Sequence, residues 1–285
     1  MTARVLFVTG KGGTGKSGVA SALAHEAARQ GLRVLLLGMA GASAAKAAGT
    51  AASTRDLHGG RLVEKTLDGK RDLEAFLTRV LGLGLLARRL GQSRTFSAVA
   101  AAAPGVADLV AFSSIAAEAG RRRDLVVVDA PASGHSVPLL TAAARVLELA
   151  PVGPVAREAR RALAMVGDRR AFAALLVTTP EELAVSEVLT LRDDVRKAGV
   201  ACVHVVVNGV WPAYVSEADG ERLAAAAVSS DATTHWRRHR RQADLVTALE
   251  ARVGACTRLG FSFRSGRPPA ADIGALLELL EGEAA

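Results

Sequence analysis

The stretch Gly10-Lys11-Gly12-Gly13-Thr14-Gly15-Lys16-Ser17 follows the apolar run Val5-Leu6-Phe7-Val8 and precedes a helix-compatible segment, residues 17–30. It matches the pattern G-x-x-x-x-G-K-[ST]. Closely spaced glycines let successive backbone N–H groups turn inward, and beside a helix N-terminus such groups form a nest for an anion. Strand, loop and helix in this order predict a phosphate-binding loop, with an ordinary glycine-rich turn as the alternative.

This loop predicts a nucleotide site with particular contacts. Lys16 would reach the β- and γ-phosphates, and the Ser17 hydroxyl would bind Mg²⁺. The other expected nucleotide contacts come from the loop and the first turn of the helix, at Gly12, Gly13, Thr14, Gly15 and Gly18.

Lys11 places a second lysine in the loop. The pattern K-G-G-x-G-K-[ST] resembles the deviant Walker A loop of the ATPases that include the MinD, ParA, nitrogenase-reductase and ArsA families. In those families this lysine crosses a dimer interface to the nucleotide of the other subunit. The resemblance therefore implies a dimer in which Lys11 acts in catalysis together with Lys16. A solvated loop lysine is the alternative.

Composition indicates a globular protein with a sizeable core. The chain has 285 residues, half of them hydrophobic, which suits one large α/β domain or two small ones. It has no run of about 18 uncharged apolar residues and enters a strand directly, so we expect a cytoplasmic protein without stable membrane insertion. Cys202 and Cys256 lack metal-binding spacing and are expected to be buried apolar residues.

The net charge of +8 comes mostly from arginine. Residues 121–123 and 237–241 are arginine-rich runs that could contact nucleic acid or an acidic partner. Such runs are more typical of solvated helix ends. We therefore expect no nucleic-acid partner, and a DNA-partitioning ATPase is a weaker alternative.

The order of elements predicts an α/β fold with a doubly wound, mainly parallel sheet. Residues 4–9 and 33–37 are the first two strands, and the helix between them ends near Gly31. Residues 41–120 show helical periodicity and are expected to form a helical insertion in a single domain, residues 1–285. Residues 73–90 have one apolar face, which predicts a core-facing helix or, alternatively, a groove for a hydrophobic client.

Residues 124–129 read as a buried strand that ends in a carboxylate, the arrangement of a Walker B strand. Such a strand carries Asp129 to the carboxyl edge of the sheet, beside the loop, where it can hold Mg²⁺ directly or through water. An aspartate that caps the next turn is the alternative.

Residues 129–135 resemble the D-T-A-P-T-G-H segment of the ArsA family, the arsenite-pump and tail-anchored-protein-targeting ATPases. The resemblance implies that ATP is the nucleotide and that Ser133, Gly134 and His135 form a second switch that senses the γ-phosphate. It also implies that Asn208, at the end of the strand-like run 205–208, reads the adenine base. Further similarities lie at residues 104–108, 176–183 and 264–280.

The sequence departs from the family at the first switch. Where the family reads D-P-A-H-S the aspartate position falls on Ala40, and residues 40–53 contain no acid. Because positioning and electrostatics supply most of phosphoryl-transfer catalysis, hydrolysis should be slow. A similar divergence occurs in a bacterial subset of paired, unlike copies.

The sequence therefore predicts an ArsA-like ATPase that uses ATP and Mg²⁺ and couples nucleotide state to a conformational change on a client. It would form a homodimer or a heterodimer with an ArsA-like paralogue. The alternative is a catalytically weak nucleotide-binding subunit of such a hetero-oligomer.

Overall fold

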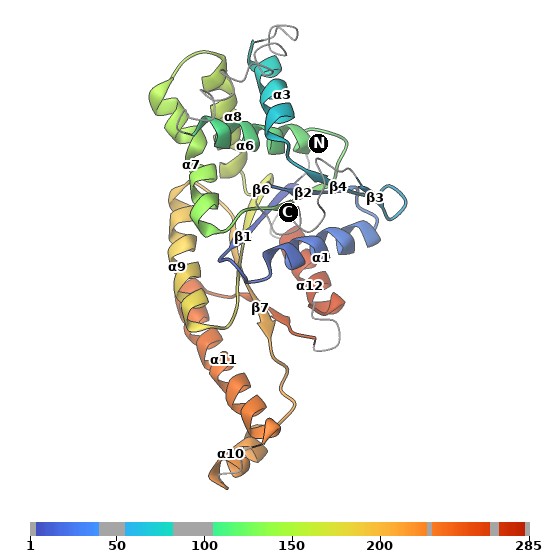
Figure 1. The fold of residues 1–285 in the computed structure, drawn as a ribbon, viewed down its shortest axis with the longest axis vertical. Coiled ribbons are helices and arrows are strands. Elements are labelled where there is room, and N and C mark those ends of the chain that lie inside the picture. Colours follow the sequence, from blue (N-terminus) through green and yellow to red (C-terminus); the bar gives the residue numbers. More distant parts are fainter. Residues whose placement is uncertain (1–3, 40–54, 82–104, 227–229, 263–267, 283–285) are drawn as a thin grey trace.

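The structure is a computed structural model that describes residues 4–39, 55–81, 105–226, 230–262 and 268–282. A twisted sheet runs through the molecule and helices cover both of its faces (Figure 1). Ala40, the expected position of the first switch, lies outside the described residues.

The strands form one sheet of eight in the described residues, in the order β3-β4-β2-β5-β1-β6-β7-β8. All neighbouring pairs are parallel except β3 and β4. The strands span β1 Arg4–Gly10, β2 Val34–Gly38, β3 Arg55–Leu57, β4 Leu62–Thr66, β5 Leu125–Asp129, β6 Phe172–Thr178, β7 Val203–Val210 and β8 Thr257–Gly260.

The helices form two layers. Buried side chains of α1 and α12 pack on one face of the sheet, and those of α3, α6, α7, α8, α9 and α11 belong to the core on the other. Their bounds are α1 Lys16–Arg29, α3 Gly69–Leu81, α6 Val106–Ala119, α7 Ser133–Leu149, α8 Pro154–Gly167, α9 Glu182–Lys197, α10 Glu217–Ala225, α11 Asp231–Val253 and α12 Ala270–Gly282.

The apolar run before the loop contributes side chains to the hydrophobic cores on both faces of the sheet. Val5 and Phe7 point into the core beneath α7 and α9, while Leu6 and Val8 point into the core beneath α1 and α12. Successive side chains of a strand face opposite sides, so a fully apolar strand suits a sheet covered on both faces. The predicted α/β fold with a mainly parallel sheet is confirmed.

Strand β5 lies between β1 and β2. Its register pairs Asp129 with Val8 on one side and with Gly38 on the other. The strand that ends in a carboxylate thus finishes beside the strand that leads into the 10–17 loop. This order places the loop and Asp129 at the same edge of the sheet.

The expectation of an all-helical stretch over residues 41–120 is wrong for its described part. Residues 55–57 and 62–66 are strands, and β4 extends the sheet by pairing with β2. The turn between them carries positive φ at His58, Gly59 and Gly60, which is turn rather than helix geometry. That residues 41–120 form an insertion within a single domain remains a prediction.

Beyond β7 the chain forms a projecting arm, made of α10 and the N-terminal half of α11 (Figure 1). Trp236 of α11 is buried against Gly220 of α10, where an added Cβ would lie 2.2 Å from the indole nitrogen. The Trp236 indole N–H donates to Glu217 at 3.1 Å, and Glu217 also pairs with Arg240 at 3.3 Å. The arm is therefore held together by its own side chains.

The opposite ends of β2 and β5 are joined by an ion pair. Arg33 donates from its backbone N and its guanidinium to Asp124, and these bonds lower the pKa of Asp124 to about 2. A carboxyl with a lowered pKa stabilises the fold above its ordinary pKa, and the gain disappears as the pH falls toward the lowered value.

We expect Asp124→Asn to unfold at a lower urea concentration than the unaltered chain at neutral pH. The difference should shrink as the pH is lowered from about 4 to about 2. Urea unfolding followed by circular dichroism across this range measures it. A difference that is constant with pH would contradict the assignment.

Candidate functional site

The loop between β1 and α1 has the backbone of an anion nest. Gly13 and Gly15 both have φ of 87°, a left-handed conformation that glycine adopts without strain. Gly15 is the N-cap of α1 and Gly18 lies in its first turn. Gly12, Gly13 and Gly15 are exposed. The free N–H groups of the helix start thus face an open loop.

Lys11 and Lys16 are tied together by the loop backbone. The carbonyl oxygen of Lys11 accepts hydrogen bonds from Nζ of Lys16 and from the hydroxyl of Thr14, both at 2.9 Å. Burial lowers the pKa of Lys16, and the carboxylates of Asp129 and Glu187 oppose that shift. The half-buried Lys16 ammonium is therefore held against the loop, close to two acids.

Asp129 is buried at the end of β5, and its Oδ1 has no hydrogen-bond partner among the described residues. Burial raises its pKa, while a hydrogen bond from the Ser17 hydroxyl and the charge of Lys16 lower it. A buried carboxylate oxygen without a partner is costly. Carboxylate and hydroxyl oxygens are ligands that hard divalent cations prefer, so this pair fits such an ion.

The segment after Asp129 leads directly into α7. Ser133 is the first residue of that helix and Gly134 is exposed in its first turn. Strand β1 also contacts this segment, because the Thr9 hydroxyl donates to the carbonyl of Pro131 at 3.0 Å. The expected second switch is thus adjacent to the end of β1.

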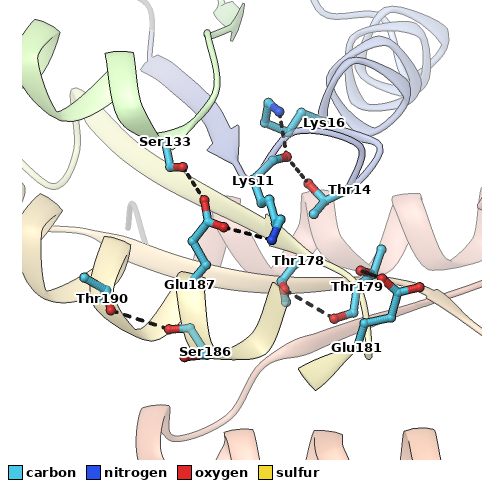
Figure 2. A network of polar contacts seen from close by, with 10 residues as sticks. All are labelled: Lys11, Thr14, Lys16, Ser133, Thr178, Thr179, Glu181, Ser186, Glu187 and Thr190. Atoms are coloured by element: carbon cyan, nitrogen blue, oxygen red, sulfur yellow. Dashed lines mark hydrogen bonds and ion pairs between the residues drawn. The ribbon is translucent and has the colours of Figure 1, made fainter. Parts of the chain in front are cut away.

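Glu187 of α9 is a site residue that the sequence analysis missed. Its Oε1 accepts a hydrogen bond from the Ser133 hydroxyl at 2.6 Å, and its Oε2 lies 3.1 Å from Nζ of Lys11 (Figure 2). These two donors, Ser133 first, lower the pKa of Glu187 and keep the carboxylate charged. An acid inside a helix has no local sequence signal for such a contact.

Asn208 reaches the loop from the end of β7. Its side-chain amide donates to the carbonyl oxygen of Thr14 at 2.9 Å. An added Cβ on Gly15 would lie 2.3 Å from the same amide nitrogen. Asn208 is therefore packed on the loop, at the side of α1.

The cysteines lie away from this site. Cys202 is buried just before β7, and Cys256 is half-buried and donates to Glu250 at 3.3 Å. Burial raises the pKa of Cys256 to about 12. Within the described ranges, no helix is long and apolar enough to cross a membrane.

The fold and the arrangement of loop, lysine and strand-end aspartate are those of an α/β protein with a phosphate-loop NTPase-like fold. Residues 3–150 match the model of the anion-transporting ATPase family, ArsA, and the chain belongs to that family. It is therefore an ATP-hydrolysing enzyme. The family predicted from the sequence is confirmed.

Individual relatives agree with this assignment. The chain is 28% identical over 246 residues to ATPase BagA of Mycobacterium tuberculosis, a stretch that covers 80% of this chain and 71% of that protein. It is 27% identical over 243 residues to a candidate arsenical pump-driving ATPase 2 of Aquifex aeolicus, which covers 73% of this chain and 81% of that protein.

Proposed function

We propose that the chain binds ATP with Mg²⁺ at the carboxyl edge of β1 and β5, and that it works as a slow ATPase which changes the conformation of a partner or client. The observation that carries this proposal is the buried Oδ1 of Asp129, which lies beside Ser17 and Lys16 and has no hydrogen-bond partner in the part of the chain that the structure describes. A carboxylate, a hydroxyl and an ammonium group that suit a metal-bound triphosphate lie together there, and one carboxylate oxygen is left without a hydrogen bond from any described residue.

Each predicted residue has a role in this proposal. Lys16 binds the β- and γ-phosphates, and Ser17 and Asp129 hold the metal ion. Bound magnesium would neutralise charge on the β- and γ-phosphate oxygens. Backbone N–H groups would contact the phosphates at Gly12, Gly13, Thr14, Gly15 and Gly18. Gly134 would contribute to the second switch, and Asn208 would contact the adenine base.

For Asn208 to contact adenine, its amide must leave the carbonyl of Thr14 or use its second N–H and its oxygen. An amide has two donors and an acceptor, so it can keep the loop contact and still bind a base edge. Asn208→Ala should therefore weaken ATP binding more than binding of inorganic triphosphate.

The proposed dimer rests on Lys11. Its ammonium is 3.1 Å from Glu187 in a single chain, and in the dimer it would contact the nucleotide of the partner subunit. The partner is a second copy or an ArsA-like paralogue, and the proposed client surface lies on the predicted insertion, residues 41–120, whose described helices are α3 and α6. An enzyme that consumes ATP in this way is proposed to act in the cytoplasm.

A second candidate function follows from Ala40. With no acid at the expected first-switch position, the chain would hold ATP without efficient turnover and support a better-equipped paralogue. Binding and hydrolysis measured side by side on the purified chain separate the two functions. Clear turnover supports the ATPase, while tight binding without turnover supports the nucleotide-holding subunit.

Asp129→Asn tests the metal site with opposite effects on stability and activity. The raised pKa of Asp129 means that its charge destabilises the folded chain at neutral pH. We expect the variant without nucleotide to have a larger free energy of unfolding, and this gain should grow as the pH rises above about 4. We expect Mg²⁺-dependent hydrolysis to fall below detection.

Asp124→Asn is the matched control, because it changes an aspartate at the other end of the same strand. It should lower stability and leave hydrolysis intact. Thermal unfolding and phosphate release measure both properties. An Asp129→Asn chain that hydrolyses ATP normally would remove Asp129 from the metal site.

A further inference from the structure

Glu187 connects parts of the nucleotide site that are distant in the sequence. Lys11 belongs to the 10–17 loop, Ser133 begins α7, and Glu187 lies in α9. Figure 2 shows the carboxylate of Glu187 between the Lys11 ammonium and the Ser133 hydroxyl. One side chain thus ties the loop to the expected second switch and to a third element.

Two polar groups near Glu187 make local contacts instead. The Thr190 hydroxyl donates to the carbonyl of Ser186, one turn earlier in its own helix. Glu181, just before α9, accepts from the hydroxyl of Thr179 at 3.4 Å. These contacts are local, whereas Ser133 and Lys11, which contact Glu187, both lie at the nucleotide edge of the sheet. Its position is therefore specific to that edge.

The charges around the loop suggest why Lys11 needs this partner. In the chain alone, Lys11 and Lys16 are two cations close to the carboxylates of Asp129 and Glu187. A bound triphosphate adds several negative charges and competes with Glu187 for the Lys11 ammonium. The side chains of Lys11 and Glu187 are 29% and 35% exposed, so the pair can separate without opening the core.

We propose that Glu187 is a positioning residue that holds Lys11 until a nucleotide phosphate takes its place, so that phosphate binding breaks the link between the loop and α9. This inference rests on the proposed function, because it requires a nucleotide at the 10–17 loop. The phosphate belongs either to the nucleotide of the same chain or to that of a second copy. Both present the same anion to Lys11.

A double-mutant cycle tests the exchange. The affinity for Mg-ATP is measured calorimetrically for the full chain, for Glu187→Gln, for Lys11→Ala and for the double variant. Glu187→Gln removes an ion pair that must otherwise break, so it should tighten binding in the unaltered background. In the Lys11→Ala background no such pair exists. We expect the factor by which Glu187→Gln raises the affinity for Mg-ATP to be about five times larger with Lys11 present than without it.

The cycle separates the exchange from simple repulsion. A Glu187 carboxylate that only repels phosphate would give equal gains in both backgrounds, and equal gains at every protein concentration would overturn the proposal. A difference between the gains that is constant with protein concentration assigns the phosphate to the same chain. A difference that grows with protein concentration assigns it to a second copy.

Two controls keep the result interpretable. Glu181→Gln removes a nearby carboxylate that contacts Thr179 and should leave the affinity unchanged. Glu187→Asp keeps the charge and should return the affinity toward that of the unaltered chain. If the unaltered chain fails to bind ATP, the proposed function fails and this inference fails with it. Binding with equal gains overturns this inference alone.

Discussion

Lys16→Ala is expected to abolish ATP hydrolysis and to weaken ATP binding by at least about a hundredfold. Lys16 is half-buried, and its ammonium donates to the loop carbonyl of Lys11 at 2.9 Å. In the proposed function this is the cation that meets phosphate inside the loop, next to the buried Asp129. No other described lysine occupies an equivalent place, since Lys11 faces Glu187.

Calorimetric binding and phosphate release measure this effect. Lys197→Ala is the matched control, because Lys197 is an exposed lysine at the end of α9 that pairs with Asp194 at 3.6 Å. It removes the same charge from the chain far from the loop and should change neither quantity. Normal turnover by Lys16→Ala would mean that the 10–17 loop is not the nucleotide site.

Gly10→Ala is expected to lower the free energy of unfolding by about 3 kcal/mol. Gly10 ends β1 with φ of 150°, and a Cβ at this position would lie 2.0 Å from the carbonyl oxygen of Val177. The two residues are paired in the register of β1 and β6. Because β6 is buried along its whole length, its backbone cannot move aside without disturbing both cores.

Gly12→Ala, in the same loop, separates this steric effect from a general effect of losing a glycine. Among the described residues, apart from Gly12 and its two chain neighbours, no atom lies within 4 Å of a Cβ built on Gly12, and its φ is not positive. Its stability should stay within about 0.5 kcal/mol of the unaltered chain. Urea unfolding of both variants measures the difference. Similar unfolding midpoints for Gly10→Ala and the unaltered chain would show that β1 and β6 are farther apart than the register places them.

Local features of the sequence predicted the centre of the fold correctly. The loop, the apolar strand before it and the strand that ends in Asp129 each carry their signal within about ten residues. An apolar strand with a glycine-rich loop and a helix leaves few geometries open. The carboxyl ends of parallel strands meet at one edge, so Asp129 and Lys16 could be expected close together before their structure was known.

Other features depend on partners that are distant in the sequence. β4 carries Glu64 and Lys65 in its five residues, so it lacks the pattern of a buried strand, and its assignment comes from pairing with β2. Lys65 is compatible with the sheet because its ammonium pairs with the buried Glu118 at 2.7 Å. Because Glu118 lies far from residues 62–66 in the sequence, this ion pair cannot be predicted from the sequence of the strand alone.

The role of Glu187 could not be predicted for the same reason, because its partners are distant in the sequence. Its contact with Lys11 requires that β6 lies next to β1 and that α9 packs on β6. Neither the position of Glu187 in its helix nor the composition around it marks this outcome. The order of the strands decided which side chain of α9 faces the loop.

The length of α11 gives the projecting arm a mechanical property. Val246 and Leu249 fix the C-terminal half of this helix in the core that it shares with α9, and Arg241 pairs with Glu182 of α9 at 2.7 Å. At about 1.5 Å per residue, Trp236 lies about 15 Å beyond Val246 along an unbroken helix. A tilt of about 10° at the core would carry the tip about 3 Å. The helix would then act as a lever whose short end rests on α9, the element that contacts the 10–17 loop through Glu187.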